Sequence, residues 1–252
     1  MTTKYKLTIG WLYPDLMSIY GDRGNIMALF HRAQLRDITV TVKPISLYAP
    51  LLDLKSSDIL FMGGAQDRQQ AIVGKDLESK KETLKEMIEG GVPGAYICGG
   101  YQFLGKYYKE ADGTQIEQLG LLDFYTETPG EGEKRCVGNI VIESAKLTGE
   151  SCLLVGFENH GGRTYLGKGI EPLGKVVKGY GNNGKDGTEG LLYKNTIGSY
   201  FHGPILPKNP EVTDWLLTKA LEKKYKSHIR LQALDDTIEM QARTAIIKKV
   251  MK

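Results

Sequence analysis

The sequence predicts an α/β protein with a mostly parallel central sheet flanked by helices and an additional β-rich part in the second half. Three observations support this fold class. Short apolar runs alternate with amphipathic stretches over about the first 111 residues, which is typical of a doubly wound sheet. From about Leu119 onwards, glycine-punctuated strand patterns follow one another. Two helical stretches then close the chain.

The first half is expected to contain strands at YKLTIGWLY (5–13), TVTVKPISL (39–47), SDILFMGG (57–64) and PGAYIC (93–98). Helices are expected over GNIMALFHRAQLR (24–36), over the amphipathic stretch 67–91, and over YQFLGKYYKEA (101–111), where the apolar residues have helical spacing. In such a sheet, ligands bind outside the carboxyl ends of the strands. Cys98 and the glycine pair at positions 63 and 64 both lie at such ends.

The second half is expected to form strands at 119–127, 136–144, 153–160, 173–181, 188–195 and 198–206, followed by helices at 210–225 and 235–251. No linker or repeat divides the chain, so we expect one domain over residues 1–252, with residues 208–252 forming its C-terminal helices.

The segment GYGNNGKD (179–186) matches a glycine pattern that binds phosphate in other proteins. A strand follows it where such a loop needs a helix, and Asp186 stands where Ser or Thr would contact magnesium. A Gly/Asn hairpin turn is the better interpretation. We therefore expect no nucleotide cofactor in this chain.

Composition argues against several classes of protein. The chain of 252 residues has a net charge of +3, which is too slight to predict a nucleic-acid partner. Its three cysteines form no C-x-x-C pair, which argues against a metal site or a disulfide framework and favours a cytoplasmic location. The N-terminal apolar run meets Pro14 and Asp15 before it could act as a signal peptide, and no stretch predicts a membrane span.

Cys98 lies at the junction between an expected strand and an expected helix. Gly99 and Gly100 permit the sharp backbone turn that such a junction needs. The first N–H groups of the helix are free to face a negative charge that forms on the sulfur or on an atom that the sulfur attacks. This pattern is typical of a nucleophile elbow with cysteine in place of serine.

A cysteine nucleophile usually needs a histidine within hydrogen-bond reach. The chain has four histidines. His31 falls on an expected helix and His228 in a lysine-rich segment, where surface or packing roles are the better interpretation. His160 and His202 each follow an apolar strand, and the pattern alone leaves both open as the base or as structural residues.

Five segments together resemble the class I glutamine amidotransferases of the cobyric-acid-synthase-like branch. They are YPDLMSIYGDRGN, FMGGAQD, ICGGYQFLG, GFENHGGRT and SYFHGPIL, and they run from about residue 7 to residue 207. More narrowly, this set resembles the GatD-type glutaminase subunits of lipid II isoglutaminyl synthases. The resemblance implies that Cys98 is the nucleophile and that His202 is its base.

The resemblance also implies the reaction and the remaining site residues. The Cys98 thiolate would attack the carboxamide of glutamine, and a thioester would then be hydrolysed to leave glutamate and ammonia. The N–H groups of Gly99 and Gly64 would stabilise the oxyanion. Gln102 would help to hold the substrate, and Arg135 would bind its carboxylate, because a guanidinium group can grip a carboxylate in a bidentate manner.

Ammonia released into water is lost, so the resemblance implies a partner. That partner would be a Mur-ligase-like subunit of the MurT type, forming a heterodimer with this chain and binding ATP and Mg²⁺. It would activate the α-carboxylate of D-glutamate in the stem peptide of lipid II, which ammonia converts to D-isoglutamine. The lipid-linked acceptor would be presented to the partner, and this chain itself would need no cofactor.

Two other functions are compatible with the same residues: a free-standing cysteine hydrolase of γ-glutamyl substrates, and a non-catalytic subunit that only binds a partner. One departure from the family concerns the base. Many class I amidotransferases carry a glutamate two residues after the histidine, whereas here Pro204 occupies that position. Either an acidic residue elsewhere in the chain orients His202 or the partner supplies one, and we expect that the partner does.

Overall fold

The structure is a computed structural model that describes residues 5–130 and 132–251. Its centre is a six-stranded sheet with the spatial order β13-β14-β4-β3-β1-β2. The strands are β1 (Tyr5–Leu12), β2 (Ile38–Ile45), β3 (Ile59–Met62), β4 (Gly94–Ile97), β13 (Leu191–Tyr193) and β14 (Thr196–Ser199). Every neighbouring pair is parallel except β13 with β14. The predicted mostly parallel sheet is confirmed.

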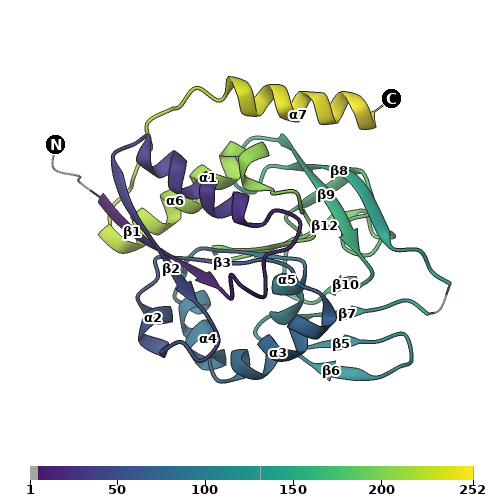
Figure 1. Ribbon diagram of the computed structural model, residues 1–252. Coiled ribbons are helices and arrows are strands. Elements are labelled where there is room, and N and C mark those ends of the chain that lie inside the picture. The colour runs from purple at the N-terminus through teal and green to yellow at the C-terminus, as the bar shows by residue number, and fades with distance from the viewer. Residues whose placement is uncertain (1–4, 131, 252) are drawn as a thin grey trace.

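Helices cover both faces of this sheet (Figure 1). They are α1 (Arg23–Gln34) and α6 (Pro210–Tyr225) on one face, and α2 (Leu51–Lys55), α3 (Asp67–Glu78) and α4 (Lys81–Glu89) on the other. The central strands β3 and β4 are buried at every position, as expected for parallel strands covered on both faces. The amphipathic stretch 67–91, expected as one helical segment, divides into α3 and α4.

The expected helix over 101–111 is wrong beyond its first turn. The structure has a short helix, α5 (Gly99–Phe103), and then a strand, β5 (Tyr107–Lys109). The strand is favoured because β5 pairs with β6 (Gln115–Glu117) and β7 (Phe124–Glu127), and because Tyr107 stacks on Tyr125 with ring centroids 5.0 Å apart. Tertiary pairing therefore overrides the helical spacing of the apolar residues.

Two smaller sheets form the β-rich part, which confirms that prediction. One has the order β10-β7-β5-β6 and the other β12-β11-β8-β9. The remaining strands are β8 (Cys136–Ser144), β9 (Cys152–His160), β10 (Arg163–Leu166), β11 (Gly174–Lys178) and β12 (Thr188–Glu189). The segment 179–186 lies in the loop that joins the antiparallel strands β11 and β12, as the hairpin interpretation required.

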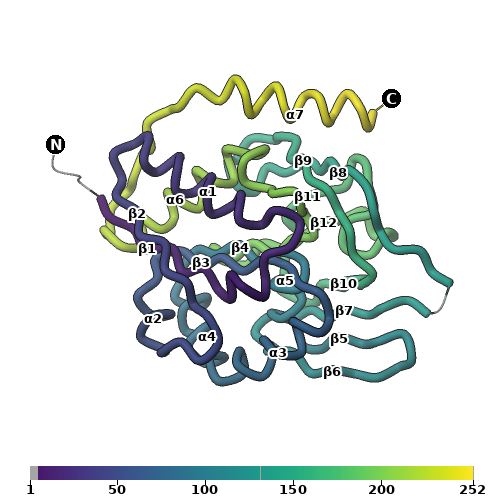
Figure 2. Tube along the Cα trace, in the orientation of Figure 1, coloured from purple at the N-terminus to yellow at the C-terminus, as the bar shows by residue number. Residues whose placement is uncertain are grey.

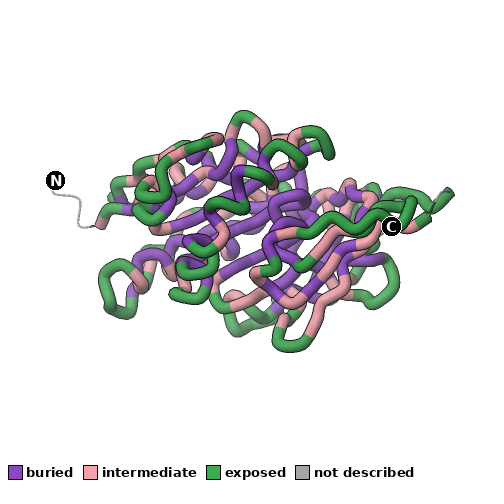
Figure 3. Tube along the Cα trace, turned by 90° about the horizontal axis from the view of Figure 1, so that it is seen from below, coloured by how far each residue is buried: buried purple, intermediate pink, exposed green. Residues whose placement is uncertain are grey.

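A single cluster of buried apolar side chains extends from Leu7 to Ile229. Figure 3 shows buried segments running through the interior and exposed ones around the periphery. The last helix, α7 (Thr237–Val250), lies on the outside of the molecule beyond the short 3₁₀ helix η1 (Leu206–Lys208). Arg32 on α1 binds Asp214 on α6 and also Asp236, the residue before α7, and so ties these helices together. Within the described ranges, no helix is both long and apolar enough to cross a membrane.

Candidate active site

The carboxyl ends of four adjacent parallel strands bring the predicted site residues together. Cys98 follows β4, Gly64 lies in the loop after β3, and His202 lies just beyond β14. The loop after β1 joins them, since Ile19 donates its N–H to the carbonyl oxygen of Gly64 at 3.3 Å. Figure 2 shows this loop passing beside α5. The site therefore forms at the edge where ligands of open α/β sheets bind.

The backbone at Cys98 has the strained geometry of a nucleophile elbow. Its φ is 52° and its ψ is −109°, a combination that a residue with a Cβ rarely adopts. The N–H of Cys98 donates to the carbonyl oxygen of Ser199 at 2.9 Å, which fixes the nucleophile to the neighbouring strand β14. Gly99 then begins α5, so its N–H is among the first amides of the helix. Cys98 itself is 8% exposed.

His202 is fully buried beside this cysteine. Its N–H donates to Phe157 on β9 at 2.7 Å, and its carbonyl oxygen accepts from Phe157 at 3.2 Å, so the backbone of the base is held on both sides. Gly64 lies between the base and the nucleophile: a Cβ on Gly64 would be 3.0 Å from Cε1 of His202 and 3.2 Å from Cβ of Cys98. A side chain at position 64 would therefore crowd both reactive side chains.

The charge environment of His202 favours the imidazolium form. Burial lowers the pKa of His202, but the negative charges of the Cys98 thiolate and of Asp22 oppose it and raise the pKa to about 10. A raised pKa means that the protonated ring is retained well above neutral pH. The site is therefore suited to hold a thiolate–imidazolium pair, the reactive form of a cysteine nucleophile.

Asp22 is the acidic partner of His202 that the sequence analysis missed. Both side chains are 0% exposed, and Oδ1 of Asp22 lies 3.9 Å from Nδ1 of His202, an ion-pair distance. Neither of these two atoms has a hydrogen-bond partner among the described residues. The neighbouring Gly63 makes room for the carboxylate, since a Cβ there would lie 2.4 Å from Oδ2 of Asp22.

The sequence contains a feature that could have identified Asp22. Asp22 belongs to the motif YPDLMSIYGDRGN, in the loop that follows β1. The rule that directed attention to Cys98, a reactive group beyond the carboxyl end of a parallel strand, applies equally to this loop. The sequence led us to expect that the partner supplies this carboxylate. In the structure, Asp22 of the chain itself lies beside the base.

The two predicted oxyanion donors, the N–H groups of Gly64 and Gly99, differ in their surroundings. The N–H of Gly64 donates to Oδ2 of Asp22 at 2.7 Å, so this amide is already engaged within the chain. The N–H of Gly99 stands at the start of α5, beside the nucleophile. Asp22 therefore contacts two of the predicted site elements at once, the base through Oδ1 and the Gly64 amide through Oδ2.

The two predicted substrate-binding residues differ in burial and in hydrogen-bond partners. Gln102 is buried, and its side-chain Nε2 donates to the hydroxyl of Tyr200 at 3.1 Å. Arg135 is exposed and contacts Asn159, with Nε 3.2 Å from Oδ1. Asn159 in turn donates to the hydroxyl of Tyr20 at 2.9 Å, and the Tyr20 ring lies 4.8 Å from the His202 ring. Arg135 is thus linked to the site through two intervening side chains.

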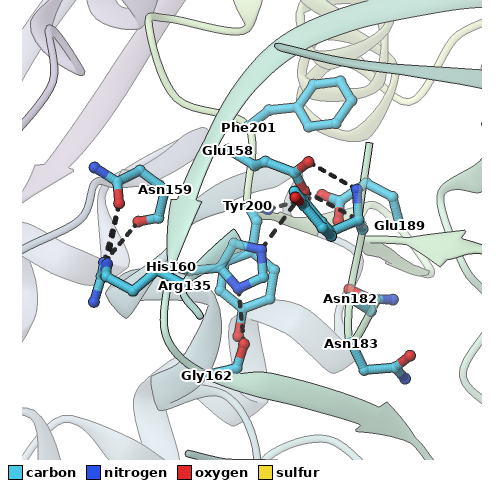
Figure 4. A network of polar contacts seen from close by, with 12 residues as sticks. Arg135, Glu158, Asn159, His160, Gly162, Asn182, Asn183, Glu189, Tyr200 and Phe201 are labelled. Carbon is cyan, nitrogen blue, oxygen red and sulfur yellow. Dashed lines mark hydrogen bonds and ion pairs between the residues drawn. The ribbon is translucent and has the colours of Figure 1, made fainter. Parts of the chain in front are cut away.

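The other three histidines lie outside the Cys98 pair. His31 is exposed on α1, and the exposed His228 contacts Glu222. His160 is buried, stacks on the Tyr200 ring with centroids 3.7 Å apart, and places Nδ1 2.7 Å from the carbonyl oxygen of Gly162 (Figure 4). Burial lowers the pKa of His160, which favours a neutral ring. These contacts are those of a packing residue.

Two fully buried glutamates lie behind His160. Glu158 accepts the N–H groups of Tyr180 and Gly181 at 2.7 and 3.0 Å. Burial, with the Glu158 carboxylate adding to it, raises the pKa of Glu189 to about 7. No group of three or more His, Cys, Asp or Glu residues in the described part of the chain is arranged to hold a metal ion.

Comparison with known proteins gives the family. Residues 8–210 match the CobB/CobQ-like glutamine amidotransferase domain. The chain is 48% identical, over 97% of its length and 96% of the relative's, to the subunit GatD of lipid II isoglutaminyl synthase (glutamine-hydrolysing) from Staphylococcus aureus. It is 43% identical to the subunit of the same name from Streptococcus pneumoniae, over 94% of this chain and 89% of that relative.

Solved structures agree on the fold. A glutamine amidotransferase superimposes with a TM-score of 0.55 and 18% identity, over 84% of this chain and 98% of that chain. A second, from Thermotoga maritima, has a TM-score of 0.52 and 16% identity, over 95% and 93% of the two chains. The chain is an α/β glutamine amidotransferase. Within that class it belongs to the CobB/CobQ-like family, in agreement with the resemblance found in the sequence.

Proposed function

We propose that this chain is the glutaminase subunit of a lipid II isoglutaminyl synthase. The observation that carries the proposal is similarity along almost the whole chain to two subunits of that name, at 48% and 43% identity. In this proposal, glutamine is hydrolysed to glutamate and ammonia at Cys98 and His202. The placement of both residues at adjacent strand ends, around Gly64, supports the assignment.

The proposed reaction assigns one step to each group. The Cys98 sulfur attacks the carboxamide carbon of glutamine, and the resulting oxyanion is stabilised by the Gly99 amide, with the Gly64 amide joining once Asp22 releases it. Imidazolium at His202 gives its proton to the departing ammonia and leaves a thioester. Neutral His202 then takes a proton from water, which attacks the thioester and releases glutamate.

A partner is part of the proposal, because the relatives are named as subunits and ammonia is useful only at an acceptor site. We propose a Mur-ligase-like partner of the MurT type, which binds ATP and Mg²⁺ and activates the α-carboxylate of D-glutamate in lipid II. Ammonia then forms D-isoglutamine. This chain needs no cofactor, and the complex acts in the cytoplasm on a lipid-linked acceptor presented to the partner.

Nitrogen tracing tests this function. The chain, the partner, ATP, lipid II and glutamine labelled with ¹⁵N in its side-chain amide are combined, and the stem peptide is analysed by mass spectrometry. We expect ¹⁵N in D-isoglutamine, and we expect the Cys98→Ala chain to support amidation only from added free ammonia. Rapid glutamate release by the isolated chain, with no transfer of ¹⁵N, would instead identify a free-standing hydrolase.

Asp22→Asn is expected to lower glutamate release by roughly 10- to 100-fold. The amide keeps the size of the carboxylate but loses the charge that stabilises imidazolium at His202. A hydrogen-bonded triad aspartate contributes about 10⁴ in rate, and the 3.9 Å separation here predicts a smaller effect. The measurement is kcat with and without the partner. An unchanged kcat under both conditions would mean that the partner, and not Asp22, orients His202.

Arg135→Ala is expected to raise KM for glutamine by about 10- to 100-fold and to leave kcat within a small factor. A charge-assisted hydrogen bond to the substrate carboxylate contributes about 1.5–3 kcal/mol, and such an anchor acts mainly on the ground state. Steady-state kinetics with Lys134→Ala as the matched control measures this effect. If KM stays normal in Arg135→Ala and rises in the control, the neighbouring lysine is the anchor.

A further inference from the structure

We infer that Glu189 is a positioning residue for the Cys98–His202 pair, an inference that rests on the proposed function. Glu189 ends β12 and does not belong to any of the five family-like segments of the sequence. Its side chain is 0% exposed. Its contacts lead to the backbone of both reactive residues.

Glu189 holds the backbone where the chain leaves the central sheet. Its Oε1 accepts the hydroxyl hydrogen of Ser199 at 2.8 Å and the N–H of Tyr200 at 2.8 Å. The Ser199 hydroxyl oxygen in turn accepts the N–H of Phe201 at 3.0 Å. After β14 ends at Ser199, these two amides have no neighbouring strand to pair with, and a buried N–H without an acceptor costs about 1–3 kcal/mol. One carboxylate therefore secures the turn that leads to His202.

The same anchor also reaches the nucleophile. The carbonyl oxygen of Ser199 accepts the N–H of Cys98 at 2.9 Å, so Ser199 is bound to Glu189 through its hydroxyl and to Cys98 through its backbone. Tyr200 extends the contact further, because its hydroxyl accepts from the Gln102 side chain at 3.1 Å. Figure 4 shows Glu189, Tyr200 and His160 grouped in this network.

Glu189 thus fixes both sides of the reacting pair without touching either side chain. The base lies three residues after Ser199, and the nucleophile is bound to Ser199 directly. A displacement of about 1 Å between reacting groups can cost roughly 100-fold in rate. Loss of the acceptor at Glu189 therefore changes the rate of the chemical step, while Arg135, the proposed anchor of the glutamine carboxylate, keeps its own contacts with Asn159.

The test compares two substitutions of similar volume in the full chain. Glu189→Gln keeps an oxygen that accepts from Ser199 and Tyr200, whereas Glu189→Met removes it. We expect kcat for glutamate release to fall about tenfold or more in Glu189→Met with KM within about twofold, and Glu189→Gln to retain kcat within about threefold. Equal impairment of the two variants, or wild-type kcat in a folded Glu189→Met protein, would overturn the inference.

A second readout does not depend on glutamine. Iodoacetamide labels Cys98, and mass spectrometry of the labelled peptide separates it from Cys136 and Cys152. At pH 7 we expect Glu189→Met to be labelled about tenfold more slowly than wild type, because the thiolate depends on its pairing with His202, and the rates should converge near pH 10. Labelling unchanged at pH 7 would contradict the positioning role even if the protein proved to have no glutaminase activity.

Ser199→Ala covers the case in which Glu189→Met fails to fold. It removes the hydroxyl link and leaves the carboxylate bound to the Tyr200 amide. We expect a several-fold fall in kcat with KM unchanged and the same slower labelling at pH 7. Normal kcat and normal labelling in this variant would also overturn the inference.

Discussion

Cys98→Ala is expected to abolish glutamate release from glutamine and to leave the fold intact. Removing the nucleophile of a comparable catalytic unit costs on the order of 10⁴- to 10⁶-fold in rate. The alanine keeps the Cβ at the strained elbow and removes only the sulfur atom, so little packing is lost. Glutamate release by the purified variant and its thermal unfolding measure the two parts of the prediction.

Cys152→Ala is the matched control, because Cys152 is a half-buried thiol on β9, outside the site. It should retain wild-type activity. If Cys98→Ala releases glutamate at the wild-type rate, the reaction does not use this thiol and the proposed thioester does not form.

His202→Ala is expected to lower glutamate release by about 10²- to 10⁴-fold, the usual contribution of a positioned acid–base group. It should also slow alkylation of Cys98 at pH 7. The sign follows from the charge of the ring: the pKa of His202 is raised to about 10, so wild type keeps the imidazolium beside Cys98 from neutral pH to about pH 9. Alkylation rates measured from pH 6 to pH 10 should differ most at the acidic end.

The other histidines provide graded controls for this prediction. His31→Ala and His228→Ala remove exposed side chains and should leave activity unchanged. His160→Ala removes the ring that stacks on Tyr200, so we expect an intermediate loss of activity, accompanied by a lower thermal unfolding temperature. A more severe catalytic effect of His160→Ala than of His202→Ala would mean that the wrong base was chosen.

The sequence by itself determined the α/β class, the mostly parallel character of the central sheet and the elbow at Cys98. Each depends on local patterns: apolar runs alternate with amphipathic ones, and two glycines follow a cysteine at a strand end. The family resemblance depended on five short segments, and the match over residues 8–210 agrees with it. Local patterns also favoured a hairpin turn at 179–186, and the structure shows this segment between the paired strands β11 and β12.

Only the tertiary structure decided between strand and helix at Tyr107. The residues around it have helical spacing, but the hydrogen bonds of β6 and β7 and the stacked Tyr125 ring come from later in the chain. A sequence window cannot include those partners, because pairing energy depends on which strands meet. The same limitation applies to the stretch 67–91: its helical spacing did not predict the division into α3 and α4.

The contact between Asp22 and His202 likewise became visible only in the tertiary structure. The two residues are separated by most of the chain, and their contact exists because β1, β3, β4 and β14 are near neighbours in one sheet with their carboxyl ends at one edge. Glu189 is a similar case, since β12 belongs to a different sheet from the strand whose end it secures. Sequence identifies residues with reactive side chains, whereas the distances that make them a site depend on how the strands are ordered in space.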